Sequence, residues 1–309
     1  MTLFLSEDDV RTVLSPVDAV DAVERCCGRL AAGSVEIAPR RRLALEAGGL
    51  ADMAASDLEL GYAAVKAYAG FGEGAAFVVA LFATDRPELV ALLEADQLGR
   101  LRTGAASAVA AKYLAREGAA SLGVIGCGRQ SETQVSCIRA ALPMIERVVA
   151  YCRTERNLRA FCQRVGAEPG ESHRDAAEQD VVVTITTSRD PVLRGEWLRP
   201  GVLVCAAGAN HPAARELDNV VLERASFVCC DWLEQARLES ADLIEPVERG
   251  VLDWLEVHEL HEVVAGELPG RQSPDDIVVF KSNGIAAWDV AAAAASFERA
   301  RERGVGREL

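Results

Sequence analysis

Two different spacings of apolar residues divide the chain. Between Ile37 and Glu94, short apolar runs broken by glycine are typical of β-strands, and the short connections between them predict a mainly antiparallel sheet. The predicted strands of this block are Arg41–Leu45, Ala63–Tyr68, Phe77–Ala83 and Leu89–Glu94. After residue 118, strand and helix patterns alternate, which predicts a parallel sheet with crossover helices. The fold class is therefore α/β, with two domains.

The alternating half repeats the order strand, glycine turn, helix. Its predicted strands are Ser121–Ile125, Arg147–Tyr151, Val181–Ile185, Val202–Ala206 and Phe227–Cys230, and its first helices are Gln130–Leu142 and Glu155–Val165. This order favours a Rossmann-type, doubly wound parallel sheet.

Helical patterns frame the antiparallel block. Ser6 before three acidic residues predicts an N-capped helix, and a second helix is expected after Pro16. An alanine-rich helix over Gln97–Glu117 ends at Gly118, and the last helix, Ile285–Arg303, is expected to pack back on the first domain. The predicted domains are therefore residues 1–117 with 289–309, and residues 118–288.

Composition and charge exclude several classes of partner. Acidic residues outnumber basic ones 47 to 33, and a net charge of −14 disfavours nucleic acid. No apolar stretch approaches the roughly 20 residues that span a bilayer, and the acidic N-terminus lacks the pattern of a secretory signal, so no membrane partner and a cytoplasmic location are expected. The nine cysteines form no CxxC pair, which predicts reduced thiols and no metal site.

A glycine loop opens the second half. Gly126 and Gly128 follow an apolar strand and precede a helix, in a GxGxxS version of the dinucleotide turn that ends at Ser131. Gly126 permits the tight turn, and Gly128 lets the backbone and the helix N-terminus approach a pyrophosphate, with Arg129 and Gln130 beside it. An ordinary glycine turn of an α/β domain is the open alternative.

The end of the next strand bears on the choice of cofactor. An NAD enzyme usually places there an acid that bonds the ribose hydroxyls. Here Arg153, Thr154 and Arg156 stand instead, and arginine pairs with phosphate. This favours NADP(H), with NAD(H) possible, unless both arginines are simply surface residues.

Taken in order, six motifs resemble the ornithine cyclodeaminase and mu-crystallin family, which includes alanine dehydrogenases and ketimine reductases. The resemblance covers nearly the whole chain. Its landmarks are Pro39-Arg40-Arg41, the strand with Lys66, Leu101-Arg102-Thr103-Gly104-Ala105-Ala106, the glycine loop, Gly208-Ala209-Asn210-His211-Pro212 with Arg215-Glu216-Leu217-Asp218, and Phe280-Lys281-Ser282-Asn283-Gly284 with Asp289.

The resemblance implies a Rossmann domain plus a sheet domain that binds substrate and forms a homodimer. It implies a substrate carboxylate held by Arg41, Lys66 and Arg102, three cations around one anion. Lys66 lies among apolar neighbours, and burial would lower its pKa and make it a candidate acid or base.

Further cofactor contacts are expected from Thr103, Ser282 and Asn283. Two alternatives stay open for the arginines. Arg41 lies in a run of three arginines, so it could belong to a solvated strand edge or the register could be off by one residue, and Arg102 could be a surface residue of its helix.

Asn210 departs from the pattern of the cyclising deaminases, which carry an aspartate there. An asparagine can hydrogen-bond an amine or imine but cannot accept a proton. The sequence therefore predicts an NAD(P)H-dependent oxidoreductase for the C=N or CH–NH bond of a small amino or imino acid, with Lys66 and Asn210 as catalytic residues. The alternatives are an ornithine cyclodeaminase with catalytic NAD and a catalytically silent, crystallin-like NADPH-binding protein.

Overall fold

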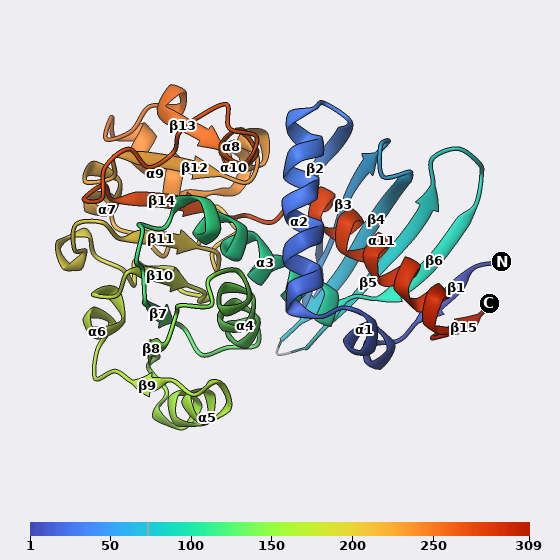
Figure 1. Ribbon diagram of the computed structural model, residues 1–309, viewed down its shortest axis with the longest axis horizontal. Coiled ribbons are helices and arrows are strands. Elements are labelled where there is room, and N and C mark those ends of the chain that lie inside the picture. Colours follow the sequence, from blue (N-terminus) through green and yellow to red (C-terminus); the bar gives the residue numbers. More distant parts are fainter. Residues whose placement is uncertain (73) are drawn as a thin grey trace. The chain divides into compact units, whose positions relative to one another are not determined.

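The computed structural model describes residues 1–72 and 74–309, which form two compact units. Unit 1 comprises residues 1–102 and 285–309, and unit 2 comprises residues 103–284. Each unit is built on one sheet (Figure 1). The predicted α/β fold, with a parallel sheet and a second sheet, is confirmed.

The sheet of unit 1 is antiparallel from β2 to β6, as the apolar pattern predicts. Its order is β15-β1-β6-β5-β4-β3-β2, with β1 parallel to β6. The strands are β1 (Leu3–Leu5), β2 (Val35–Leu45), β3 (Gly48–Asp57), β4 (Tyr62–Phe71), β5 (Gly74–Ala83), β6 (Leu89–Glu94) and β15 (Arg307–Glu308). Sequence patterns did not reveal β3, because its glycines and alanines lack the β-branched side chains that mark a strand.

Helices cover one face of this sheet. They are α1 (Glu7–Val13), α2 (Pro16–Ala31) and α11 (Ala286–Arg303), and α11 packs on β3 and β4 and beside α2 (Figure 1). Ser6 and Ser15 form capping boxes that start the first two helices. The alanines of α11 are buried and let its backbone approach the sheet of unit 1 closely.

Unit 2 is a parallel sheet of order β13-β12-β14-β11-β10-β7-β8-β9. Its strands are β7 (Ser121–Ile125), β8 (Arg147–Tyr151), β9 (Glu168–Pro169), β10 (Val181–Thr184), β11 (Leu203–Ala206), β12 (Phe227–Cys230), β13 (Val257–Glu259) and β14 (Val278–Lys281). Its helices are α4 (Ser131–Ala141), α5 (Glu155–Val165), α6 (His173–Ala177), α7 (Asn219–Glu223), α8 (Leu233–Glu239), α9 (Ala241–Glu248) and α10 (Leu260–Val264), with 3-10 turns η1 (Gly195–Trp197) and η2 (Trp254–Glu256).

The division between the units falls inside helix α3 (Asp96–Leu114), whereas the sequence pattern places a boundary after that helix, at residue 117. The cause is packing on α4. A Cβ atom at Gly104 would lie 2.3 Å from the carbonyl oxygen of Thr133 and 3.1 Å from Cys137 Sγ, so only glycine allows this approach. The second half of α3 therefore packs on α4 of unit 2.

None of the helices in the described ranges, 1–72 and 74–309, is long and apolar enough to cross a membrane.

Candidate active site

Lys66 is buried in the centre of the unit 1 sheet. It lies on β4 opposite Met53 of β3 and Val79 of β5, both of them core residues, and the lysine itself is 3% exposed. A Cβ atom at Gly99 of α3 would lie 3.0 Å from Lys66 Nζ, so the absence of a side chain at position 99 leaves room beside the amine. A lysine in such surroundings needs an ionic partner.

That partner is Asp289, in the first turn of α11. Lys66 Nζ donates to Asp289 Oδ1 at 2.7 Å, and Arg102 Nε donates to the same oxygen at 3.0 Å. We call these three residues the Asp289 cluster. Arg102 is buried, which excludes the interpretation of a surface helix position. Two cations meet one carboxylate, so the three charges sum to +1.

Burial sets the proton affinity of the lysine. It lowers the pKa of Lys66 from 10.5 to about 8, and the nearby charges of Arg102 and Arg40 act in the same direction, while Asp289 opposes them. Burial alone would raise the pKa of Asp289, but the charges of Arg102 and Lys66 outweigh it and hold that pKa below its ordinary value. The cluster thus contains an ionised carboxylate and an amine that titrates near physiological pH.

The structure places Arg40 near Lys66 and turns Arg41 outward. Arg40 is 8% exposed and its guanidinium lies 3.7 Å from Met53 Sδ, whereas the side chain of Arg41 is 79% exposed and pairs with Asp52 at 2.7 Å. The cause is an irregularity in β2: its register with β3 shifts between residues 38 and 41, where Pro39 has no N–H to donate. A shift of one residue reverses the face on which a side chain lies.

The glycine loop of unit 2 has the geometry of an anion cradle. Gly126 adopts a positive φ of 111°, and a Cβ there would lie 2.4 Å from the carbonyl oxygen of Ile185. Ser131 Oγ donates to the carbonyl oxygen of Gly126 at 2.8 Å and closes the turn from inside. No atom within the described residues comes within 4 Å of a Cβ at Gly128, so this side of the loop is open.

Helix α4 begins at this loop without a side-chain cap. Gln130 is its N-cap residue and makes no side-chain hydrogen bond to the first turn. Gly128, Arg129 and Gln130 are exposed, so the N-terminus of α4 is accessible from solvent, and a helix N-terminus favours an anion.

The loop also lies at the point where the sheet changes direction. From β7 the chain proceeds outward to β8 and β9, and it then returns to place β10 on the other side of β7. In open parallel sheets, ligands bind at the carboxyl ends of the strands on either side of such a switch point.

The end of β8 carries the three residues that sequence reasoning assigned to the cofactor ribose. Arg153, Thr154 and Arg156 are exposed there, one strand away from the glycine loop. The charge of Arg153 is close enough to His173 to contribute, after burial, to lowering the pKa of that imidazole. Glu155, the acid in this segment, is paired with Arg159.

The remaining site residues predicted from the sequence lie at other positions of unit 2. Asn210 is exposed in the loop after β11. Ser282 and Asn283 follow β14, where Ser282 Oγ donates to Asp231 at 3.2 Å and the Asn283 N–H donates to the same carboxylate at 2.8 Å. Thr103 is buried near α4, with its carbonyl oxygen 3.4 Å from Gln134 Nε2.

Comparison with known proteins agrees with this geometry. The model of the ornithine cyclodeaminase/mu-crystallin family matches residues 1–304. The chain belongs to this family.

Individual family members are similar over their full length. An alanine dehydrogenase of Archaeoglobus fulgidus is 36% identical, covering all of this chain and 98% of the relative. The structure of Thermococcus litoralis Δ1-pyrroline-2-carboxylate reductase in complex with NADH and L-proline superposes with a TM-score of 0.95 at 31% identity, over the whole of both chains. An archaeal alanine dehydrogenase dimer with bound NAD gives 0.93 at 33% identity, over all of this chain and 98% of the other.

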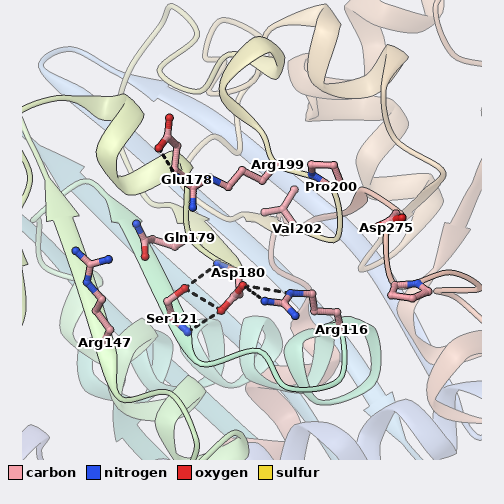
Figure 2. Close-up of a pocket in the computed structure, with 11 residues that line it drawn as sticks. Arg116, Ser121, Arg147, Glu178, Gln179, Asp180, Arg199, Pro200, Val202 and Asp275 are labelled. Carbon is pink, nitrogen blue, oxygen red and sulfur yellow. Dashed lines mark hydrogen bonds and ion pairs between the residues drawn. The ribbon is translucent and has the colours of Figure 1, made fainter.

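A pocket in unit 2 lies at the edge of the parallel sheet opposite the glycine loop (Figure 2). Ser121, Arg147 and Asp180 stand at or just before the first residues of β7, β8 and β10, so this pocket is at the amino ends of the strands. Arg116 pairs with Asp180, and Arg147 and Arg199 pair with Glu168 and Glu178. The charges in this pocket are paired, and ligands of open parallel sheets bind at the carboxyl ends of the strands. The pocket is therefore a poor candidate for the active site.

Sequence reasoning assigned no role of their own to two residues that the structure places close to Lys66. Asp289 ends the last of the six motifs and has no role assigned from the sequence, although an aspartate inside an alanine-rich apolar helix is a signal for a buried ion pair. Arg40 enters only through the open alternative that the register at Arg41 is off by one residue, because strand alternation cannot locate a register shift at Pro39.

Proposed function

We propose that this member of the family is an NAD(P)H-dependent oxidoreductase that acts on the C=N or CH–NH bond of a small amino or imino acid. The observation that carries the proposal is the Asp289 cluster, a buried group with excess positive charge, in a chain whose other unit carries a dinucleotide loop. A buried cationic group attracts a ligand carboxylate, and the dinucleotide loop attracts a pyrophosphate.

The substrate carboxylate is held in this proposal by Arg40 and Arg102. Arg102 approaches Asp289 through Nε, which leaves the two terminal nitrogens of its guanidinium to address a ligand oxygen. Arg40, buried and near Lys66, replaces Arg41 in the set that the resemblance implied. Two guanidinium groups favour a planar carboxylate because each can bond it bidentately.

Lys66 is proposed to transfer the proton. A pKa of about 8 keeps much of the amine protonated at neutral pH and still lets it give up its proton readily. In the reductive direction Lys66 Nζ protonates the imine nitrogen, and in the oxidative direction it accepts a proton from the amine. Asp289 holds the ammonium in place, and Asn210 hydrogen-bonds the substrate nitrogen without exchanging a proton.

The glycine loop fits a dinucleotide cofactor. The open side of Gly128, the uncapped start of α4 and the positive φ of Gly126 suit a pyrophosphate, with Thr103, Arg129, Gln130, Ser282 and Asn283 proposed as further contacts. When bound, NAD(P)H supplies the hydride for the carbon of the C=N bond.

Steady-state kinetics test the proposal. Purified protein is expected to oxidise NADPH or NADH in the presence of a cyclic ketimine carboxylate, or of pyruvate with ammonium, and to reduce NAD(P)+ in the presence of the product amino acid. Cofactor binding without turnover of any member of this panel would refute the oxidoreductase and support a silent binding protein. Ammonia release from ornithine without net cofactor change would support a cyclodeaminase.

We propose further that NADP(H) is preferred over NAD(H). Support comes from the exposed Arg153, Thr154 and Arg156 at the end of β8 and from the pairing of Glu155 with Arg159. Replacing Arg153 with alanine is expected to weaken NADPH binding by about tenfold, the size of one charge-assisted contact, and to change NADH binding little. Fluorescence titration with both cofactors measures this, with Arg249→Ala, at an exposed position after α9, as the control. Equal losses for the two cofactors would contradict the preference.

A homodimer is the proposed assembly, formed through the outer face of the unit 1 sheet. We define this face by Val65, Val78 and Phe82, which lie opposite the side covered by α11 and are between 36% and 42% exposed. An exposed apolar sheet face of this kind is typical of an interface. A second copy of the chain is the proposed occupant because a similar alanine dehydrogenase is a dimer.

Changing Val65 to aspartate tests the interface. The variant is expected to run as a monomer in light scattering coupled to size exclusion, because a dimer would bury one uncompensated carboxylate in each copy. Val17→Asp, on an exposed position of α2, is the matched control and is expected to leave the dimer intact. A wild-type monomer, or a dimeric Val65→Asp variant, would contradict the proposed interface.

A further inference from the structure

Three buried ionic residues connect the loops at the carboxyl edge of the parallel sheet. Glu216, Asp242 and Lys281 are each 0% exposed. We call them the loop clamp. They come from distant parts of unit 2, and all three contact the ends of β10, β11 and β14 or the segment just after β11.

Glu216 binds the backbone of two loops. Its carboxylate accepts the N–H groups of Gly208 at 2.7 Å and Ala209 at 3.1 Å, just before Asn210. It also accepts the N–H of Thr186 at 2.7 Å and the hydroxyl of Thr184 at 3.0 Å, at the end of β10. Four donors around one carboxylate suit its ionised form.

Lys281 holds the same loop from its carbonyl side. Its Nζ donates to the carbonyl oxygen of Ala209 at 2.5 Å and to that of Ser282 at 3.1 Å, and it lies 3.4 Å from Asp242 Oδ2. Asp242 Oδ1 in turn accepts the N–H groups of Glu216 and Leu217. One ammonium thus joins the Asn210 loop to the loop that carries Ser282 and Asn283.

The packing around Gly208 shows how closely the clamp is fitted. A Cβ atom there would lie 2.3 Å from the Thr186 nitrogen and 2.5 Å from Glu216 Oε1. Burial raises the pKa of Glu216, and the charge of Lys281 opposes that shift. Buried ion pairs of this kind often add little net stability, so a role in fixing geometry is a reasonable account of their presence here.

We propose that Glu216 and Lys281 are positioning residues, which fix the Gly208–Asn210 loop so that Asn210 meets the substrate nitrogen. The inference rests on the proposed function for the role of Asn210. The clamp itself rests on the hydrogen bonds to Gly208 and Ala209 and is measurable without any substrate.

A double-mutant cycle between Lys281→Met and Asn210→Ala separates positioning from general damage. If Lys281 acts through Asn210, kcat/KM for imino-acid reduction falls in each single variant. In the double variant the two losses should not multiply: its kcat/KM is expected to be at least about tenfold higher than the value obtained by multiplying the two single losses. Lys112→Met, on an exposed position of α3, is the matched control and keeps its activity. Independent, multiplying losses would overturn the proposal.

Hydrogen exchange supplies a readout that needs no activity. In Lys281→Met, the amides of Gly208 and Ala209 are expected to lose at least about tenfold of their protection, while the strand amides of β11 keep theirs. Glu216→Gln, which keeps the side-chain size, is expected to lower the protection of the same two amides. It is the variant to measure if Lys281→Met does not fold. Unchanged protection at both amides would overturn the clamp. A wild type inactive on every imino acid would refute the proposed function instead.

Discussion

Replacing Lys66 with methionine is expected to lower kcat/KM for imino-acid reduction by about 10³-fold, the size of a general-acid contribution. Methionine preserves much of the side-chain volume but has no proton to give. Cofactor binding is expected to be unchanged, because the glycine loop belongs to unit 2. Steady-state kinetics and cofactor titration measure the two effects separately.

The pH profile makes this prediction specific. With a pKa of about 8, Lys66 is protonated below that pH, so kcat/KM for reduction is expected to fall as pH rises through it. In the oxidative direction the neutral amine is needed, and kcat/KM is expected to rise over the same range. Lys66→Met should show neither the fall in the reductive direction nor the rise in the oxidative direction, and Lys112→Met should show both. A Lys66→Met enzyme within tenfold of wild type, with the same profile, would rule out this role.

Changing Asp289 to alanine is expected to destabilise the fold by about 3–5 kcal/mol at pH 7, because it leaves Lys66 and Arg102 buried without their shared carboxylate. The free energy of unfolding from urea titration measures the loss. Since the pKa of Asp289 is held below its ordinary value, the stabilisation by this carboxylate is fully present at pH 7 and is lost only as the pH falls to acidic values.

High pH and a second substitution provide the controls. The folded-state pKa of Lys66 is below its unfolded value of 10.5, so the folded state releases its proton first and stability contributed by this group rises between about pH 8 and 10.5. Removing Asp289 lowers the pKa of Lys66 further, because that carboxylate raises it, so the loss in Asp289→Ala should shrink as the pH rises toward about 8 and stay level above it. Lys66→Met in the same chain should restore part of the loss at pH 7. A loss below about 1 kcal/mol at pH 7 would show that the cluster is not the buried ion pair described here.

The fold could be predicted from the sequence because its elements carry local signals. The strand preceding Gly126, the helix that starts at Ser131 and the alternation after residue 118 all follow from spacing and turn chemistry. The short helices α8 and α9, which have no side-chain cap, and the glycine-rich β3 lack such signals, because tertiary packing stabilises them more than their own periodicity does.

The candidate site was predictable only in part. Lys66 was noticeable as a charge among apolar residues, whereas its partner Asp289 lies 223 residues away and is brought to it by the packing of α11 on the sheet. Which of Arg40 and Arg41 is buried depends on one irregularity in the β2–β3 pairing at Pro39, and the spacing of apolar residues does not predict such an irregularity. Long-range pairing and register are therefore what the structure adds.

Deuteride transfer tests the central claim most directly. The protein is incubated with a cyclic ketimine carboxylate and NADPH or NADH that carries deuterium on the transferred face of nicotinamide C4, and the product amino acid is examined by mass spectrometry. The account predicts one deuterium, bound to the α-carbon, with one cofactor oxidised for each product formed. Product without deuterium, or a cofactor that keeps its deuterium while the ketimine is consumed, would contradict a net imine reductase.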